Sequence, residues 1–223
     1  MGWLAFAAIF AAFFATHSLP LRPPVKAKLV GVLGRRGFAL AYSVLSLVML
    51  AWLIVAAGQA PFVELWEPAA WQRQIALAGL LALCLVMALA IGRPNPLSFG
   101  GARNASFDPQ RPGMVRWTRH PLLLGLAVWA GLHLLPNGDL AHVVLFGVLL
   151  AFALLGMGIV DRRKRRLLGD ADWTALRDQV ARAPLVQRPA SWPETLLRLA
   201  AGIAVFLLLV WLHPPVLGVY PLA

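Results

Sequence analysis

Histidine is the residue type in this chain whose chemistry stands out, and there are five along the sequence. His17 ends the first apolar stretch, His120 and His133 flank the fourth, His142 opens the fifth and His213 closes the sixth. A neutral imidazole ligates metal ions, and the group changes charge near neutral pH. Ionisable side chains at membrane depth are costly, so they mark functional sites by default. We therefore take these histidines as the first candidates for chemistry, although His142 and His213 also suit plain helix ends at a membrane interface.

The start of the fourth apolar stretch has the sequence of a helix N-terminus. Pro121 suits the first helical turn, where its missing N–H costs nothing, so His120 is predicted at the N-cap beside Arg119. The positive end of a helix dipole favours an anion, such as a carboxylate, and keeps an imidazole neutral. The sequence thus predicts that Arg119 and His120 bind an anionic group of a cofactor.

Three residues follow in this stretch at four-residue steps. Gly125, Trp129 and His133 would share one helix face. A glycine lets a flat group approach the backbone, a tryptophan can stack on that group, and a histidine can ligate its metal. Tight helix packing, with His133 hydrogen-bonded to a neighbour, would produce the same stripe. The spacing leaves both interpretations open.

The sequence has no motif that indicates other kinds of chemistry. There is no nucleophile triad, phosphate loop, zinc-binding Cys/His pattern or pair of carboxylates within an apolar stretch. Hydrolysis and nucleotide-driven transport are therefore poorly supported. Cys84 is the only cysteine, which excludes an intrachain disulfide. Because it lies mid-stretch, we expect it to pack as a small apolar residue.

The elements that must position these residues are membrane helices. Of the residues, 60% are hydrophobic and 13% charged, whereas a soluble domain is about a quarter charged. A spanning helix needs roughly 20 mostly apolar residues. Six such stretches cover residues 2–18, 38–58, 74–92, 121–136, 140–160 and 196–213. We predict an all-α integral membrane bundle of six transmembrane helices, forming a single domain over residues 1–223.

The chain has a net charge of +11, and its positive residues are concentrated in alternate connections between the apolar stretches. The first, third and fifth connections hold nearly all the lysine and arginine, which by the positive-inside rule places them in the cytoplasm. Both termini would then be periplasmic, in a bacterial inner membrane. This distribution accounts for the charge without nucleic acid, which we do not expect as a partner. The first positive residue, Arg22, follows the first apolar stretch, which argues against a signal peptide.

Two connections have features beyond those of simple linkers. The segment 93–119 is long and rich in proline and glycine, and loops of that length are often functional. The segment 170–183 is predicted to form a cytoplasmic amphipathic helix capped by Asp170. Its apolar face would carry Trp173, Leu176 and Val180. The basic run 162–166 before it would contact anionic headgroups. Membrane anchoring explains both segments as well as a catalytic role does.

Several motifs together resemble the NnrU family. They are His17-Ser18-x-Pro20, Arg119-His120-Pro121 with Gly125, Trp129, His133 and Asn137-Gly138-Asp139, then Leu145-Phe146-Gly147 and Gly156-Met157-x2-Val160-Asp161-Arg162. The similarity extends over nearly the whole chain. NnrU proteins are bacterial inner-membrane proteins linked to denitrification through nitrite and nitric oxide reductases. The family includes plant zeta-carotene isomerase, an integral membrane enzyme that holds haem b and isomerises a carotenoid double bond.

The resemblance implies haem b here, with His17 and His133 as the metal ligands. Ala130 stands where the isomerase has its proposed alternative cysteine ligand, so this chain lacks the residue that a ligand switch would use. The haem would handle or sense nitric oxide, or serve an isomerase-like reaction on an apolar small molecule. A non-enzymatic role, as an assembly or regulatory partner of a reductase, is also open.

A more distant resemblance points to membrane methyltransferases of the isoprenylcysteine and phospholipid type, which bind S-adenosylmethionine. It rests on Arg119-His120-Pro121-x3-Gly125 and on the segment Gly169-Asp170-x-Asp172-Trp173. Those enzymes usually carry acidic residues after the second helix of a hairpin. Here Asp161 is followed directly by Arg162, so the acidic pair is missing.

Helix geometry and the family resemblance disagree on the ligand pair. A helix rises about 1.5 Å per residue, so His133 would lie about 20 Å from the cytoplasmic face, whereas His17 would lie close to it, level with His120. The resemblance favours His17 with His133, which we place first. Simple depth favours His17 with His120, and a pair that is not two histidines is the third possibility.

Overall fold

The structure is a computed structural model that describes residues 1–222, and these residues are almost entirely helical or in turns. They hold seven α-helices and no β-strand beyond a single bridge between Glu64 and Asp139. This confirms the predicted all-α class. The chain divides into two compact units, one made of residues 1–67 and 137–145 and the other of residues 68–136 and 146 onward. Helix α5 (Leu140–Leu168) begins in the first unit and continues in the second.

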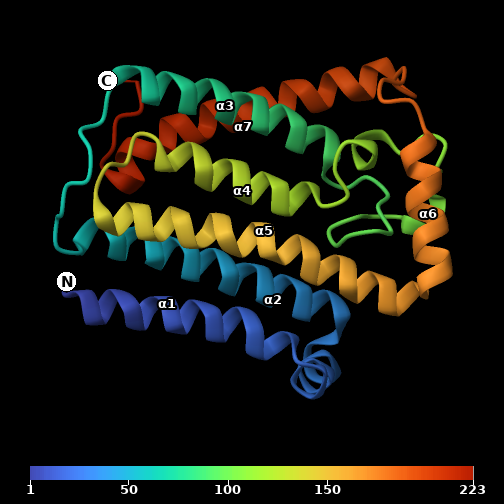
Figure 1. The fold of residues 1–223 in the computed structure, drawn as a ribbon, viewed down its shortest axis with the longest axis horizontal. Helices are drawn as coiled ribbons and strands as arrows, with labels where there is room; N and C mark the ends of the chain where they lie inside the picture. The colour runs from blue at the N-terminus through green and yellow to red at the C-terminus, as the bar shows by residue number, and fades with distance from the viewer. Residues whose placement is uncertain (223) are drawn as a thin grey trace. The chain divides into compact units, whose positions relative to one another are not determined.

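The first unit is built on α1 (Trp3–Ser18) and α2 (Pro23–Gln59), which lie side by side in Figure 1. A short 3-10 helix, η1 (Leu19–Leu21), joins them. Helix α2 begins well before the predicted span 38–58. Two prolines at the start of α2 supply the fixed φ that suits a first helical turn.

Helix α2 breaks at Gly34, whose backbone has φ 70° and ψ 166°. A side chain is disfavoured at that φ, and glycine tolerates it. The segment before the break is seen nearly end-on in Figure 1, whereas the rest of α2 runs across the view. The residues that carry the first cluster of positive charge therefore belong to a short separate helical segment and to the first turn after the break.

The second unit is built on α3 (Ala70–Ala90), α4 (Pro121–Leu134), α7 (Trp192–Leu217) and most of α5. Helix α3 packs against both α7 and α4 (Figure 1). Helices α3 and α7 approach closely at Gly202 of α7, where an added Cβ would lie 3.0 Å from the Cys84 carbonyl oxygen and 3.2 Å from the Ala88 Cβ. Small residues at such crossings let membrane helices approach closely.

Five helices among the described residues are long and apolar enough to cross a membrane: α1 together with η1, α2, α3, α5 and α7. Helix α4 has 14 residues, so it is about 21 Å long, less than the roughly 30 Å hydrocarbon core. The structure confirms a helical membrane-type protein with five candidate spans. A sixth span at α4 stays a prediction.

The helix predicted at 170–183 is present as α6 (Asp170–Arg182), but its cap is not Asp170. Gly169, with φ 88°, is the N-cap residue, and no side chain bonds the first turn. The Asp170 carboxylate instead accepts two hydrogen bonds from Arg165, at 2.6 and 2.8 Å. The predicted cap is wrong because Asp170 is the first residue inside the helix, one position after the N-cap.

The apolar face of α6 packs on protein. Trp173 and Val180 are buried together with Leu97 and Val115 of the 93–119 segment, and Leu176 packs at the edge of this cluster. The two segments that looked like independent membrane anchors thus cover each other. Their shared core fixes the loop to α6.

Candidate functional site

His120 is the N-cap residue of α4 and Pro121 is its first residue, as predicted. The His120 side chain is buried, and both of its ring nitrogens have partners. Nδ1 lies 2.9 Å from Ser98 Oγ, and Nε2 lies 2.9 Å from Asp161 Oδ1. Because the carboxylate only accepts, Nε2 carries the proton, and the neutral ring accepts from the Ser98 hydroxyl at Nδ1.

The electrostatics keep the His120 imidazole neutral. Burial is the largest effect and lowers the pKa of His120, the nearby Asp161 carboxylate acts in the opposite direction, and the positive charges of Arg119 and Lys164 lower the pKa further. The neutral imidazole is the form that the sequence predicts. The cause differs from the predicted helix dipole, because the main influence is the removal of the ring from water.

The anion beside the α4 N-terminus is supplied by the protein. Arg119 donates to Asp161 of α5 through Nη2 at 2.8 Å and Nε at 3.4 Å. The Arg119 carbonyl oxygen accepts from Asn95 Nδ2 at 2.9 Å, and the buried Asn95 is thereby tied to the same network. The sequence predicts that Arg119 and His120 bind a cofactor anion. In the structure both contact the Asp161 carboxylate, and this contact links the loop to α4 and α5.

Asp161 is the site residue that the sequence reasoning missed. It lies 41 positions after His120, and no periodic pattern links the two. The available signal was its isolation: it is a single acid placed directly before the basic run 162–166. A single carboxylate next to five cations on a long apolar helix is expected to bind a residue of another segment.

The sequence shows no nucleophile triad, yet Ser98, His120 and Asp161 form a Ser–His–Asp chain of hydrogen bonds in the structure. Ser98 and His120 are each 3% exposed, and neither lines the cavity described below. A nucleophile must reach its substrate. These residues therefore form a buried positioning network, which holds segment 93–119 against α4 and α5.

His133 belongs to a second cluster, at the other end of α4. Its ring lies 4.8 Å from the Trp129 ring, 5.1 Å from that of Phe146 and 6.4 Å from that of His213, measured between centroids. The two histidine rings are inclined by 18°. The structure therefore joins His133 to His213, a residue that we expected to be an end residue. Helix α7 continues past Pro214 and Pro215 to Leu217, so His213 lies inside the helix.

The apolar-span histidines share one hydrogen-bonding arrangement. The Nδ1 atoms of His133 and His213 each lie 2.8 Å from the carbonyl oxygen four residues earlier, that of Trp129 and Leu209 respectively. His17, in the first unit, has the same relation to Phe13 at 2.9 Å. A carbonyl oxygen only accepts, so Nδ1 carries a proton, and a neutral ring in this arrangement has its lone pair on Nε2. That tautomer suits metal ligation, and the carbonyl orients the ring.

The predicted stripe of Gly125, Trp129 and His133 serves two purposes. The space over Gly125 is filled by Met87 of α3, so this glycine allows helix packing. Trp129 contacts the rings of His133 and Phe146. The stripe therefore connects a packing contact to the aromatic and histidine cluster. Among residues 1–222 no group of three His, Cys, Asp or Glu side chains could hold a metal ion.

His142 differs from the other span histidines. It opens the helical part of α5 that belongs to the first unit. Its Nδ1 lies 2.6 Å from the Asp139 carboxylate, which also accepts from the His142 backbone N–H at 3.1 Å. This local pair holds the start of the helix and makes His142 a useful control in the experiments below.

These features define an all-helical membrane-type protein, with histidines on its apolar helices and a partly buried ionic network at the loop end of α4. The chain matches the family described as NnrU protein over residues 5–221, and it belongs to that family. Searches of curated proteins and of solved structures found no match. The membership confirms the family resemblance seen in the sequence.

Proposed function

We propose that this NnrU protein is a six-span protein of the bacterial inner membrane, with both termini periplasmic, that binds haem b and acts in nitrite or nitric oxide metabolism. The observation that carries the haem proposal is the common arrangement of His17, His133 and His213, each with Nδ1–H bound to a backbone carbonyl. The donor set thus fits an iron porphyrin, which takes neutral imidazole at its axial positions.

The residues of this chain divide into ligands and supports. His133 is the central ligand, with His17 as the partner that the family resemblance implies. His213 is a second imidazole close to His133 in the same unit. His120 is not a ligand in this proposal, because both ring nitrogens are used by Ser98 and Asp161. When bound, haem would supply a redox-active iron that can react with nitric oxide.

Trp129 and Phe146 supply the surroundings of the ligand. Their rings lie beside His133 and exclude water from it, and the Trp129 carbonyl holds the Nδ1 proton. A dry aromatic shell and a fixed ring orientation both influence the redox potential of a haem. The same surroundings suit an apolar substrate, so the alternative of isomerase-like chemistry uses the same residues.

The proposal is tested by the absorption spectrum and haem content of the purified protein. We expect about one haem b per chain, lost in His133→Ala and His17→Ala but kept in the matched control His142→Ala. Loss in His213→Ala with retention in His17→Ala would assign the pair to the second unit. A wild-type protein that takes up no haem, even when haem is added, would refute the proposal. Binding of S-adenosylmethionine by that haem-free protein would favour the methyltransferase class instead.

The physiological part needs a separate experiment. A strain lacking the protein should grow poorly with nitrite as electron acceptor and accumulate nitrite or nitric oxide. Wild-type protein should restore growth, and His133→Ala should not, at equal protein level. Restoration by a haem-free variant would instead indicate an assembly or regulatory role toward a reductase.

A further inference from the structure

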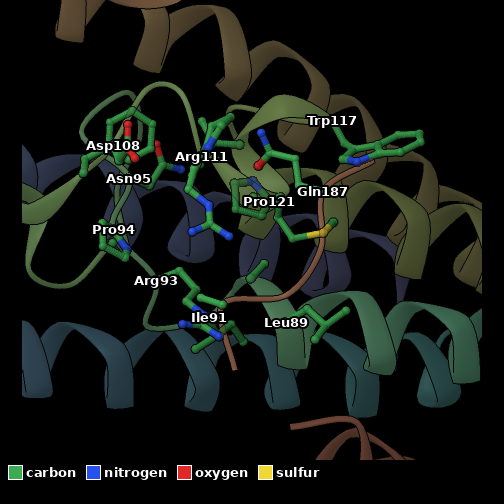
Figure 2. A pocket seen from close by; sticks show the side chains of 18 of the residues that line it. Leu89, Ile91, Arg93, Pro94, Asn95, Asp108, Arg111, Trp117, Pro121 and Gln187 are labelled. Atoms are coloured by element: carbon green, nitrogen blue, oxygen red, sulfur yellow. The ribbon is translucent and has the colours of Figure 1, made fainter. Parts of the chain in front are cut away.

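A cavity of about 440 Å³ lies in the second unit, away from the histidine cluster. Its walls come from the loop 93–119, the segment 184–190 and the ends of three apolar helices (Figure 2). Helix α3 ends there at Ala90, and α4 and α7 begin there. His133 is 13 residues along α4 from its N-cap, so it is about 20 Å from this end. The size is that of ligand pockets, about 300–1,000 Å³.

The cavity has an excess of positive charge. Arg93, Arg111 and Arg188 line it, against the single carboxylate of Asp108. Arg93 is partly neutralised, because it lies 3.2 Å from Glu194, but that carboxylate is shared with Arg198. The Asp108 carboxylate accepts from the Gln110 backbone N–H at 2.9 Å.

Arg111 and Arg188 line the cavity without an acidic partner among residues 1–222, and Arg111 is the one whose side chain Figure 2 labels. Within residues 1–222 no carboxylate lies within 4 Å of it, and its hydrogen bond goes to the Arg188 carbonyl at 3.4 Å. Figure 2 shows its side chain reaching from the loop into the cavity, on the side that faces Arg93. Arg93 and Arg111 both line this cavity, so an anion bound in it would be attracted by two guanidinium groups. Their planar donors match the oxygens of a phosphate or carboxylate.

Most of the remaining wall is apolar. It includes Phe99, Phe107, Met114, Leu122, Leu185 and Val186. Val186 and Leu185 are 82% and 52% exposed, so apolar surface continues from the cavity to the outside. A free inorganic anion would gain nothing from such walls. A molecule with an anionic head and apolar chains would use both the arginines and the walls.

We infer that this cavity binds the phosphate group of an anionic membrane lipid, with the phosphate on Arg111 and Arg93 and the first chain carbons on the apolar walls. The position supports this source, because the ends of apolar helices lie at the level of the lipid headgroups. Basic pockets between membrane helices bind such headgroups. The basic run 162–166, in contrast, does not line this cavity, and it would attract anionic lipid without selecting one.

The test is a titration of the purified full-length protein, in neutral detergent and without added haem, with short-chain phosphatidate. We expect saturable binding, weakened about tenfold or more in Arg111→Gln and little changed in Arg103→Gln. Arg103 is a matched control, because it lies in the same loop, is exposed, and does not line the cavity. Arg111 makes only one long hydrogen bond, so Arg111→Gln should keep the wild-type melting temperature.

Titrations with three further ligands distinguish a lipid headgroup from a free anion as the bound group. Short-chain phosphatidylcholine should bind more weakly, because its headgroup is zwitterionic, and glycerol phosphate should bind more weakly, because it has no chains. Inorganic phosphate that binds as tightly as phosphatidate would overturn the lipid assignment in favour of a free-anion site. Equal affinities of Arg111→Gln and Arg103→Gln would overturn the site itself. None of these outcomes depends on haem, so this inference and the proposed function fail separately.

Discussion

Asp161 lies where three segments of the second unit meet: the loop 93–119, the N-terminus of α4 and the α5 helix. It accepts from Arg119 and from His120, and the His120 ring in turn holds Ser98. Removing one partner from a buried polar network leaves the others unsatisfied, which costs more than the hydrogen bond itself contributes. Single substitutions here should therefore loosen the loop without touching any of the proposed haem ligands.

We expect Asp161→Asn to destabilise the protein by about 1–3 kcal/mol, because it removes the charge that Arg119 and His120 share. Arg119→Ala and His120→Ala should act in the same direction. The measurement is the melting temperature in detergent, with the rate of proteolysis in the loop 93–119 as a local readout. Arg162→Gln, one position away and exposed, is the control. If it were equally damaging, the basic run would hold a specific ligand.

His120 should also make stability depend on pH. Its pKa is lowered in the folded protein, whereas in the unfolded chain it is about 6.5. The unfolded state then binds the proton more readily, so stability is full above pH 6.5 and is lost as the pH falls below it. We expect the melting temperature to fall between pH 7.5 and pH 5, and to fall less in His120→Gln. An unchanged slope in that variant would show that other groups cause the dependence.

At the scale of helices, packing depends on glycines that only the structure distinguishes. Gly202→Ala should destabilise by about 1–3 kcal/mol, because its Cβ would press on the α3 backbone. Gly158→Ala is the matched control: that glycine is exposed on α5, and nothing lies within 4 Å of the added Cβ. It should be neutral or slightly stabilising, since alanine is the better helix former. Equal melting temperatures for the two variants would contradict the tight α3–α7 crossing.

Local patterns predicted the elements well and their partners poorly. The all-α class, the amphipathic helix near residue 170 and the N-cap at His120 follow from apolar length, periodicity and one proline. The early start of α2 was missed because its lysines and glycines are typical of a connection. The partner of His120 is Asp161, 41 positions further on, and the partner of His133 is His213, 80 positions further on. No periodic pattern in a single sequence links residues so far apart.

At the scale of the whole molecule, the charge alternation predicts the orientation in the membrane. Reporter fusions after Gly37, near Pro112 and near Ala183 should report cytoplasm, and fusions near Pro68 and at Ala223 should report periplasm. If α4 did not cross, the segments after it would change sides, and the fusion near Ala183 would report periplasm. That fusion therefore tests the short helix directly, and a cytoplasmic C-terminus would contradict an even number of spans.

In the first unit, backbone hydrogen bonds join the connection after α2 to the turn before α5. Leu65 and Trp66 donate their backbone N–H groups to the Gly138 carbonyl oxygen, at 2.7 and 3.1 Å, and Leu140 donates to the Val63 carbonyl at 2.9 Å. The Trp66 carbonyl oxygen fills the place of a Gly138 side chain, so only glycine fits there. During synthesis at roughly 5–20 residues per second, the first two helices emerge several seconds before Gly138 does. Helices α1 and α2 are therefore in the membrane before these hydrogen bonds can form. The rate of translation sets the earliest time at which the first unit can complete its folding.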